Sequence, residues 1–577
     1  MSSAYRLPDI TLRFLYKCEW RQSGKGARMA IGVRKRPTSR DAVWNSTLME
    51  LDREACYRAI QSRDARFDGR LFTGVRTTGI YCRPICPART PKLENVVFYS
   101  CAAAAQAAGF RACLRCRPEL SPDLAAWHGT SSSVVRALTL IAGGALDGDE
   151  ADVDGLALRL GIGGRQLRRL FTKHIGASPI AVMQTRRILF AKQLIHDTRL
   201  SMVDVAMAAG FGSVRRFNET FRRLYGRPPS QLRRKRSGAA TAGGDPPAET
   251  KLLLSYAPPY DWPAMMSFLA TRAIPGVEAV DVDRYRRTVD VDGARGTIEV
   301  TQVPGRDALA ATIRFPNVKA LPAIVARVRR VFDLGADVRM IATQLGKDPC
   351  LAPLIAARPG LRVPGAWDGF EIAVRAILGQ QITVAAARRL AGKLVAVYGS
   401  PLNPDVDEEL TTVFPTPERL AMVDLSSLGM PRARAVAVSL LAAAAANDPR
   451  LFDRDRDLDV AIARLKAVRG IGEWTAQYIA MRALREPDAF PADDVGLLRA
   501  MADVEGRRPT PAALAARAEA WRPWRAYAAQ HLWSAGGVVP RRAGRHGNAS
   551  HDRGARAPMV GSESGTHAQT NVSLRTS

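Results

Sequence analysis

Two close pairs of cysteines constrain the fold of this 577-residue chain most. Cys82 and Cys86 stand in the segment YCRPICPART, and Cys113 and Cys116 follow in GFRACLRCRP. Tetrahedral zinc needs four ligands, and each close pair can supply two thiolates from one turn. The spacing therefore predicts one zinc ion, bound by these four cysteines in a small α/β domain.

The residues around the cysteines leave two interpretations open. A closed four-thiolate site can simply hold a small domain together. A zinc-bound thiolate, however, stays ionised at neutral pH and remains a nucleophile. With arginines to hold a phosphate, such a thiolate can attack an alkyl group carried by DNA. The nearby arginines are Arg76, Arg83, Arg89, Arg111, Arg115 and Arg117.

Charge and composition narrow the class of partner. The chain has 84 Lys and Arg against 55 Asp and Glu, a formal net charge of +29, which favours a polyanion such as double-stranded DNA. Eight cysteines are sparse for this length, and no secretory signal is recognisable, so we expect a cytoplasmic protein. A membrane span is not expected, because there is no run of about 18 apolar residues.

Shifts in composition predict a multidomain α+β protein. Alternating segments such as TVDVDG and TIEVTQV indicate strands, and Ala/Leu periodicity in the carboxy-terminal half indicates helices. We expect a basic leader at 1–48 (disordered, or an over-called start site), a zinc domain at 49–125, an all-α tandem helix-turn-helix domain at 130–236, a linker at 237–250, an α+β domain at 251–360, an all-α domain at 361–540 and a disordered tail at 541–577.

The cysteine segments resemble the amino-terminal domain of the adaptive-response regulator Ada. RTTGIYCRPICPAR, ENVVFY and GFRACLRCRP carry the resemblance, and the cysteine spacings match. It implies that Cys82 irreversibly accepts a methyl group from a DNA methylphosphotriester while it stays bound to zinc, and that the other three cysteines complete the site. The DNA contacts that we expect in this domain are Arg76, Arg83 and Arg89.

Methylation of this site would act as an electrostatic switch. Zinc with four thiolates carries a net charge of −2, which repels phosphate, and methylation removes one negative charge. For a phosphate about 4 Å away the change is about 1–4 kcal/mol, depending on the effective dielectric constant. We therefore expect the methylated protein to bind DNA more tightly.

Two similar basic units at 154–176 and 201–233 each indicate a helix, a glycine-containing turn and a second helix. The pair resembles the AraC-type DNA-binding domain, which implies a transcriptional activator that binds promoter DNA and contacts RNA polymerase. The charged residues can instead simply solvate the helix faces. The candidate DNA contacts are Gln166, Arg168, Arg169, Arg215, Arg216 and Asn218.

A glycine hairpin with Gly470 and Gly472 precedes a helix that we expect to begin near Glu473. Tight glycines before a helix let backbone N–H groups approach a DNA phosphate. The hairpin, the helix and the following FPADDVGLLRA resemble the helix-hairpin-helix–GPD DNA glycosylases, in particular the AlkA group. The resemblance extends to FEIAVRAILGQQIT and WRPWRAYAAQHLW, and the 251–348 segment matches that group's amino-terminal α+β domain.

This resemblance implies that Asp494 is the catalytic carboxylate, which stabilises an oxocarbenium-like sugar or activates water. Asp493 would be a helix cap or a solvated carboxylate. Trp474 stands where related glycosylase-lyases have a lysine, so a monofunctional enzyme is expected.

Alkylated bases are cationic and attract aromatic faces. Trp474, Tyr478 and Trp533 are the expected base pocket, although core packing is the alternative interpretation of each. The target nucleotide must be flipped out of the stack. Gln381, which follows Gln380, stands where the family places the wedge that fills the gap, often a leucine; both glutamines are expected to contact DNA.

Together these features predict a DNA alkylation-response protein of the bacterial nucleoid. It would accept methyl groups, activate transcription and excise 3-methyladenine, with one zinc ion and no organic cofactor. Two alternatives remain: a regulator whose glycosylase half is an inactive DNA-binding module, or a repair enzyme whose zinc domain is purely structural. O6-methylguanine repair is not expected, because no cysteine stands in a Pro-Cys-His-Arg motif.

Overall fold

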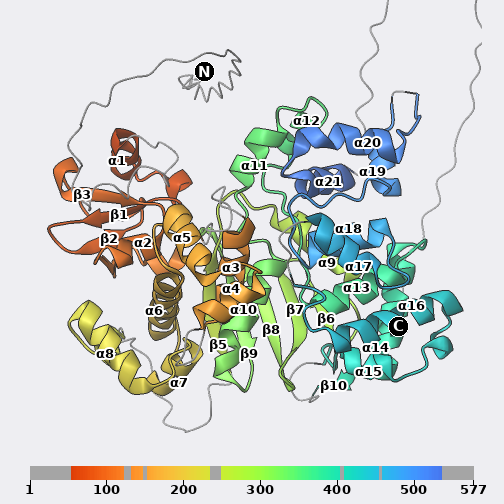
Figure 1. Ribbon diagram of the computed structural model, residues 1–577, viewed down its shortest axis with the longest axis horizontal. Coiled ribbons are helices and arrows are strands. Elements are labelled where there is room, and N and C mark those ends of the chain that lie inside the picture. The colour runs from red at the N-terminus through yellow and green to blue at the C-terminus, as the bar shows by residue number, and fades with distance from the viewer. Residues whose placement is uncertain are drawn as a thin grey trace, which may run out of the picture.

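The computed structural model describes residues 53–122, 132–146, 152–233, 249–402, 408–453, 458–503 and 505–535 (Figure 1). The expected leader at 1–48, the expected tail at 541–577 and most of the expected linker lie outside the described residues.

The zinc module is a small four-stranded sheet in the order β3-β1-β2-β4, with short helices packed on it. β1 is antiparallel to β2 and β3, whereas β2 and β4 are parallel, with Tyr81 opposite Ala112. Parallel neighbours end at the same edge of a sheet, so the residues that follow β2 and β4 meet there. The elements are α1 (Arg53–Gln61), β1 (Phe72–Val75), β2 (Ile80–Cys82), β3 (Val96–Tyr99), α2 (Ala102–Ala107), β4 (Arg111–Ala112) and the 3-10 turn η3 (Pro118–Leu120).

The helix-turn-helix module consists of two similar units joined by a long helix. In each unit the second helix buries apolar residues four positions apart, such as Phe217 and Phe221 of α8. Gly176 and Gly226 end these helices at φ +75° and +68°, a conformation that favours glycine. The helices are α3 (Ser132–Ala142), α4 (Val153–Arg159), α5 (Gly164–Ile175), α6 (Pro179–Asp197), α7 (Met202–Ala208) and α8 (Val214–Tyr225).

The expected α+β region contains an antiparallel five-stranded sheet in the order β5-β9-β8-β7-β6. The segments TVDVDG and TIEVTQV form the β7–β8 hairpin, as predicted. The elements are β5 (Thr250–Ser255), α9 (Trp262–Arg272), β6 (Glu278–Val280), β7 (Arg284–Val291), β8 (Ala294–Gln302), β9 (Ala308–Arg314), α10 (Leu321–Val331), α11 (Val338–Leu345) and α12 (Ala352–Ala357).

The carboxy-terminal region is helical, as expected, and the helix after the glycine hairpin begins at Glu473. Its elements are α13 (Gly369–Leu378), α14 (Val384–Tyr398), β10 (Ser400–Pro401), β11 (Thr412–Val413), α15 (Pro417–Ala421), α16 (Arg432–Asn447), α17 (Leu458–Lys466), α18 (Glu473–Arg482), α19 (Val495–Ala500), α20 (Pro511–Ala518) and α21 (Arg525–Ser534).

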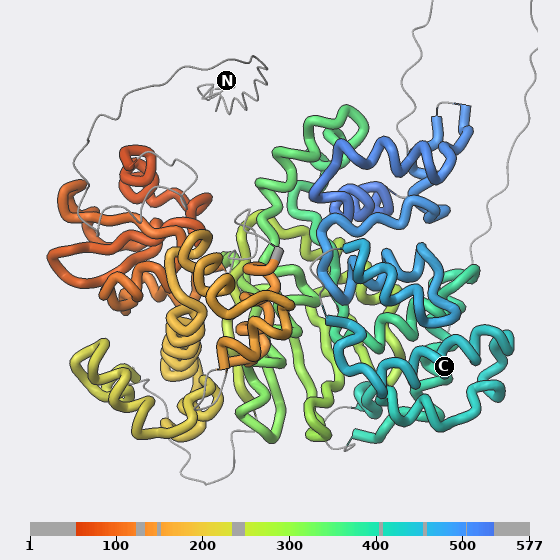
Figure 2. The backbone as a smooth tube through the Cα atoms, in the orientation of Figure 1, coloured from red at the N-terminus to blue at the C-terminus, as the bar shows by residue number. Residues whose placement is uncertain are grey.

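The helix-turn-helix module and the five-stranded sheet share one apolar core. Leu194 of α6 and Phe217 of α8 belong to the same buried cluster as Leu252 of β5 and Val325 of α10. The side chain of Gln193 donates to the Leu253 carbonyl at 2.8 Å. In Figure 2 the orange and yellow tube of the helix-turn-helix module, also called the regulator module, lies beside the green tube of the sheet. Composition indicated two units joined by a linker, and it gave no sign of this contact.

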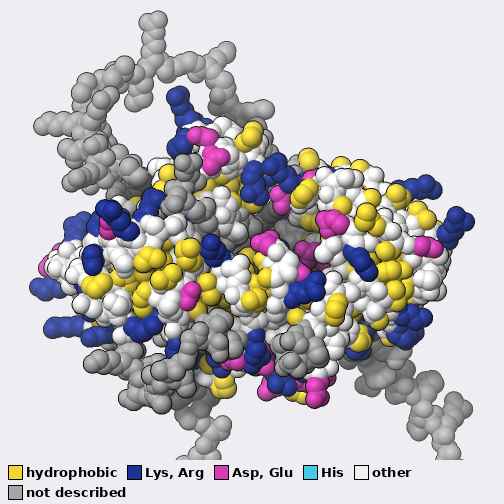
Figure 3. Space-filling view, turned by 90° about the horizontal axis from the view of Figure 1, so that it is seen from below, with side chains coloured by type: hydrophobic (Ala, Val, Ile, Leu, Met, Phe, Trp, Pro, Cys, Tyr) yellow, Lys and Arg dark blue, Asp and Glu magenta, His cyan; other side chains and the backbone are white. Residues whose placement is uncertain are grey.

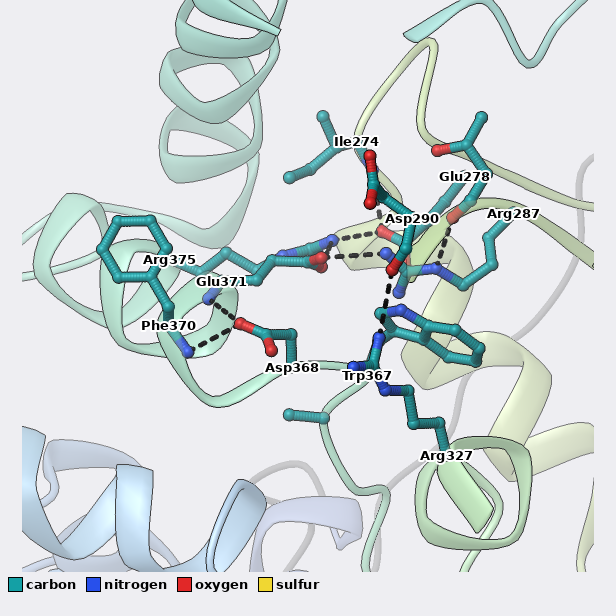
Figure 4. A network of polar contacts seen from close by, with 12 residues as sticks. Ile274, Glu278, Arg287, Asp290, Arg327, Trp367, Asp368, Phe370, Glu371 and Arg375 are labelled. Carbon is teal, nitrogen blue, oxygen red and sulfur yellow. Dashed lines mark hydrogen bonds and ion pairs between the residues drawn. The ribbon is translucent and has the colours of Figure 1, made fainter. Parts of the chain in front are cut away.

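A buried ion-pair network joins the sheet to α13 (Figure 4). Arg287 of β7 lies 2.8 Å from Glu371 of α13, and Arg375 lies 2.6 Å from Glu371 and 2.5 Å from Glu278 of β6. Two cations and two anions balance, and removal of one member of such a network typically costs about 3–5 kcal/mol. The network fixes α13, which is followed directly by Gly379 and then Gln380.

Candidate zinc centre and glycosylase site

The four predicted zinc ligands come together, with their Sγ atoms all within 4.8 Å of one another. Cys82 ends β2, and Cys113 follows β4, so the parallel pairing places them side by side. The Cys113 amide donates to the Tyr81 carbonyl at 3.0 Å, and a turn brings the Cys86 amide to within 3.2 Å of the Arg83 carbonyl. Four convergent thiols suit tetrahedral zinc.

The two pairs of cysteines differ in exposure. Cys113 and Cys116 are buried, with exposed fractions of 7% and 8%, whereas Cys82 and Cys86 are half-buried. The Arg115 amide donates to Cys113 Sγ at 3.3 Å, and the Arg83 amide donates to Cys116 Sγ at 3.4 Å. Such donors stabilise thiolate charge. The more exposed side of the cluster is therefore the one that Cys82 and Cys86 form.

The three arginines predicted to contact DNA in this module have different environments. Arg76 and Arg89 are exposed. Arg83 instead donates to Asp68 Oδ1 at 2.9 Å and to the Cys116 carbonyl at 3.2 Å, and its side chain is only 11% exposed. The DNA contacts of all three stay predictions. Arg83 also has a structural role, because it holds the segment of residues 113–119, here called the cysteine loop.

A buried charge network, which the sequence did not reveal, connects the cysteine loop to α6. Lys192 Nζ lies 2.7 Å from Glu119 Oε2 and donates to the Cys113 carbonyl at 2.9 Å, and both charged side chains are completely buried. Arg117 lies 3.0 Å from Glu119 and 2.8 Å from Asp197. In the sequence, the charged residues at 117 and 119, directly after Cys116, were the only indication of this network.

The predicted DNA contacts of the regulator module lie on the second helix of each unit, α5 and α8. All are exposed except Asn218, which is half-buried. Arg168 pairs with Asp154 at 3.4 Å, and Arg215 pairs with Glu219 at 2.9 Å. Figure 3 shows many Lys and Arg side chains on the left part of the lower face, where Figure 1 places the zinc and regulator modules. Their contacts with DNA stay predictions.

The structure brings Asp494 together with two of the three predicted pocket aromatics. Asp494 Oδ2 accepts from Trp474 Nε1 at 2.8 Å, and Oδ1 accepts from Trp533 Nε1 at 2.8 Å and from the Leu497 amide at 2.9 Å. These three N–H donors orient the carboxylate. Asp494 is itself the cap of α19. Asp493, for which a cap was one expectation, is exposed, and its pKa is raised because neighbouring protein atoms take away part of its hydration.

The third predicted aromatic, Tyr478, stacks against Trp474 with ring centroids 5.2 Å apart and planes 8° apart. Burial raises the pKa of Tyr478, but the positive charges of Arg482 and Arg272 outweigh burial, so that this pKa lies below its usual value. Arg482 was not predicted. Its spacing of four residues from Tyr478, which itself follows Trp474 by four, places the three on one helix face and was the available signal.

The glycine hairpin has the geometry that its sequence requires. Gly470 has φ +100°, and a Cβ there would lie 2.4 Å from the Cβ of Ala437. Gly472 is the N-cap of α18. Gln380 Nε2 donates to the Gly470 carbonyl and to Thr475 Oγ1, both at 3.0 Å. Gln381 is exposed with φ +57°, an uncommon backbone conformation for a residue other than glycine.

Four family models match successive parts of the chain. They are the metal binding domain of Ada at residues 55–119, a helix-turn-helix domain at 156–235, the AlkA N-terminal domain at 251–368 and the HhH-GPD superfamily base excision DNA repair protein at 374–526. They confirm the multidomain fold class and the three resemblances found in the sequence. The predicted domain limits themselves stay predictions.

Relatives cover the same modules. The "Probable bifunctional transcriptional activator/DNA repair enzyme AlkA" of Mycobacterium tuberculosis is 43% identical over 486 residues, which cover 84% of this chain and 97% of that protein. The chain belongs to this AlkA-type family. DNA-3-methyladenine glycosylase 2 of Escherichia coli is 38% identical over 50% of this chain and 98% of its own length. The bifunctional activator and repair enzyme Ada of Escherichia coli is 36% identical over 23% of this chain and 35% of its own length.

The chain is therefore a homologue of a protein named as a probable bifunctional transcriptional activator and DNA repair enzyme, and it contains glycosylase and helix-turn-helix modules. The match to a metal binding domain and the four-cysteine cluster support zinc as the bound ion. Among the described helices none is both long and apolar enough to cross a membrane.

Proposed function

We propose that this protein excises 3-methyladenine and related alkylated bases by monofunctional N-glycosidic hydrolysis, with Asp494 as the catalytic carboxylate. The observation that carries this proposal is the pair of 2.8 Å hydrogen bonds from Trp474 and Trp533 to Asp494. They hold a negative charge beside the aromatic rings that would receive a flipped base. As the glycosidic bond breaks, that charge stabilises the cationic sugar or orients the attacking water.

The aromatic set suits a cationic base. The stacked pair Trp474 and Tyr478 offers π-faces, and a cationic base is attracted to such faces. Trp474 carries no amine, and its N–H group is bonded to Asp494, so it cannot form a Schiff base with the sugar. This supports hydrolysis without a lyase step. The hairpin amides at Gly470 and Gly472, with Gln380 and Gln381, would hold the flipped DNA.

The zinc module would accept a methyl group from a DNA methylphosphotriester. In this step the Cys82 sulfur forms a bond to the methyl carbon, and the carbon–oxygen bond breaks. The oxygen keeps the electron pair and leaves as a phosphodiester anion. Bound zinc would keep the Cys82 sulfur ionised until it is alkylated. Cys82 and Cys86 are both half-buried beside two buried cysteines, and of these two the resemblance to Ada assigns Cys82 as the acceptor.

Methylation would then switch the regulator. The loss of one negative charge strengthens binding of the zinc module to DNA, and α5 and α8 would read promoter DNA from the same chain. RNA polymerase would be the partner of the activated protein in the bacterial cytoplasm. The buried Lys192–Glu119 pair supports this coupling, because it joins the cysteine loop to α6, between the two helix-turn-helix units.

One experiment tests both chemistries together. Purified protein is incubated with methylated duplex DNA, and the released bases and the mass of the protein are measured. We expect free 3-methyladenine and the transfer of one methyl group per chain. Methyl transfer without base release would instead favour an inactive DNA-binding module, and base release without methyl transfer would favour a purely structural zinc domain.

A further inference from the structure

A buried cation lies beneath the proposed base pocket. The guanidinium carbon of Arg482 lies 5.4 Å from the centroid of the Tyr478 ring and 5.5 Å from that of the Trp533 ring. Only 2% of Arg482 is exposed. Two of the proposed pocket aromatics therefore have a positive charge packed against them.

This charge is not neutralised by a carboxylate. Arg482 donates to the Pro364 carbonyl at 2.9 Å and to the amide oxygen of Gln530 at 3.1 Å, which are both neutral acceptors. In the part of the chain that the structure describes, no Asp or Glu lies within ion-pair distance of it. Burial lowers the pKa of Arg482 to about 10, so the side chain stays protonated at neutral pH.

A second arginine strengthens the positive end of the pocket. Two guanidinium groups lie close to the Phe268 ring of α9, that of Arg272 at 4.0 Å from its centroid and that of Arg482 at 4.7 Å. The positive end is thus assembled from two domains.

The negative end of the same pocket is Asp494. Trp533 contacts both ends, because its ring faces Arg482 and its Nε1 donates to Asp494. Trp474 and Arg482 stand eight residues apart on α18, which corresponds to a rise of about 12 Å along a helix. The pocket therefore has opposite charges at its two ends.

We propose that Arg482 is a positioning residue for base excision, which acts through the Tyr478 and Trp533 rings to favour movement of positive charge from the base to the sugar. This inference rests on the glycosylase function proposed above. When the glycosidic bond breaks, its electron pair goes to the base nitrogen, so a cationic base leaves as a neutral molecule and the sugar becomes cationic. A fixed cation beneath the base opposes the starting charge, and Asp494 stabilises the charge that develops.

This arrangement predicts opposite effects on binding and on chemistry. A neutral residue at 482 should let the pocket bind a cationic base more tightly and excise it more slowly. With an effective dielectric constant of about 20, each effect should be roughly tenfold. A merely structural role would weaken binding and slow excision together.

The test uses the full-length protein under single-turnover conditions. Arg482→Met removes the charge and keeps an apolar stem, Arg482→Gln is the second neutral variant, and Arg482→Lys restores the charge. Arg330→Met is the matched control: Arg330 also donates to backbone carbonyls, those of Ala366 and Trp367, but makes no described contact with the pocket aromatics. Thermal unfolding establishes which variants are folded.

Two duplexes separate charge from shape, one with cationic 7-methylguanine and one with its neutral isostere 7-deaza-7-methylguanine. We expect a folded neutral variant to excise 7-methylguanine roughly tenfold more slowly with a lower half-saturation concentration. Binding of the neutral isostere should be unchanged, and Arg482→Lys should recover most of the rate. Unchanged rate and half-saturation in the folded neutral variant would overturn the inference. If wild-type protein excises no alkylated base, it is the proposed glycosylase function that fails.

Discussion

The two candidate sites of this chain use charge in opposite ways. The zinc centre gathers four sulfur atoms within 4.8 Å, and its charge would change covalently when one of them is methylated. The proposed glycosylase site instead holds fixed charges, Asp494 at one end and Arg482 at the other, and the charge that moves would belong to the substrate. One site would therefore respond once and keep the result, and the other would return to its starting state after each reaction.

The largest expected effect concerns the zinc centre. Cys82→Ser should abolish methyl transfer completely, because an uncharged hydroxyl is a far weaker nucleophile than a zinc-bound thiolate. Mass spectrometry of peptides from protein treated with methylated DNA measures the transfer. Zinc content must be measured in parallel, because serine is also a poor zinc ligand.

Cys350→Ser is the matched control, since Cys350 is an exposed thiol outside the cluster. It should leave transfer intact. A methyl group found on Cys86, Cys113 or Cys116 of the wild-type protein would contradict the assignment of Cys82.

The next largest effect concerns the fixed carboxylate. Asp494→Asn removes the charge and leaves a single side-chain oxygen, where the carboxylate has one for each indole N–H group. The new side-chain amide N–H group then faces one of the two indole N–H donors. We expect the barrier to excision to rise by at least about 3 kcal/mol, which is roughly a hundredfold or more in rate. Release of 3-methyladenine is the measurement, and binding to undamaged DNA should barely change.

Asp493→Asn is the control for the previous substitution, because it removes the adjacent carboxylate, which is exposed and bonded to neither indole. Its effect should be mild. If Asp493→Asn proves the more damaging, the catalytic carboxylate has been assigned one residue too late. Wild-type rates in both variants would refute the glycosylase mechanism.

The switch proposed for the zinc centre should be smaller and sensitive to salt. Methylated protein should bind a promoter fragment more tightly than unmethylated protein, by about 1–4 kcal/mol at low ionic strength. The difference should shrink as salt rises, because salt screens the phosphate contact. Affinities measured across a salt series for both forms provide the check, and equal affinities at low salt would leave methyl transfer as repair without signalling.

Sequence patterns predicted the two candidate sites because the residues proposed for them stand at fixed spacings. The cysteine pairs, the β7–β8 alternation and the glycine hairpin are local patterns, and each has the predicted local structure. Long-range contacts between charged side chains have no such period. Lys192 and Glu119 are 73 residues apart in the sequence, so no local sequence pattern indicated that they would pair.

The type of a residue also did not indicate whether its charged side chain would be buried. Arg83 and Arg89 stand in the same arginine-rich segment, but only Arg83 meets a buried carboxylate, that of Asp68. Arg482 looked like an ordinary last-turn cation at the end of α18, yet it is among the largest fully buried side chains. Such residues become recognisable only when the partner elements are in place.

A smaller effect would show how far the indoles support Asp494. Trp533→Phe keeps an aromatic face and removes the hydrogen bond to Asp494 Oδ1. A hydrogen bond to a charged group contributes about 1.5–3 kcal/mol, so single-turnover excision should fall by roughly ten- to a hundredfold. Trp521→Phe is a matched control, because Trp521 Nε1 also donates to a carboxylate at 2.8 Å, that of Asp348. An equal loss in both variants would indicate a general effect on folding.

The smallest expected effect separates the two sites directly. Removal of zinc by a chelator should abolish methyl transfer but change the rate of 3-methyladenine excision by less than about twofold. The apolar clusters of the zinc module and of the glycosylase helices are distinct, so the carboxylate and its indoles do not depend on packing against the cysteine loop. One described ion pair does join the modules, between Arg70 and Asp337, which caps α11. Arg70→Met should therefore serve as the comparison, because it removes this pair and leaves zinc in place. The excision rate could instead fall together with the zinc content while Arg70→Met excises at the wild-type rate. In that case the zinc centre controls the glycosylase by a route other than this ion pair.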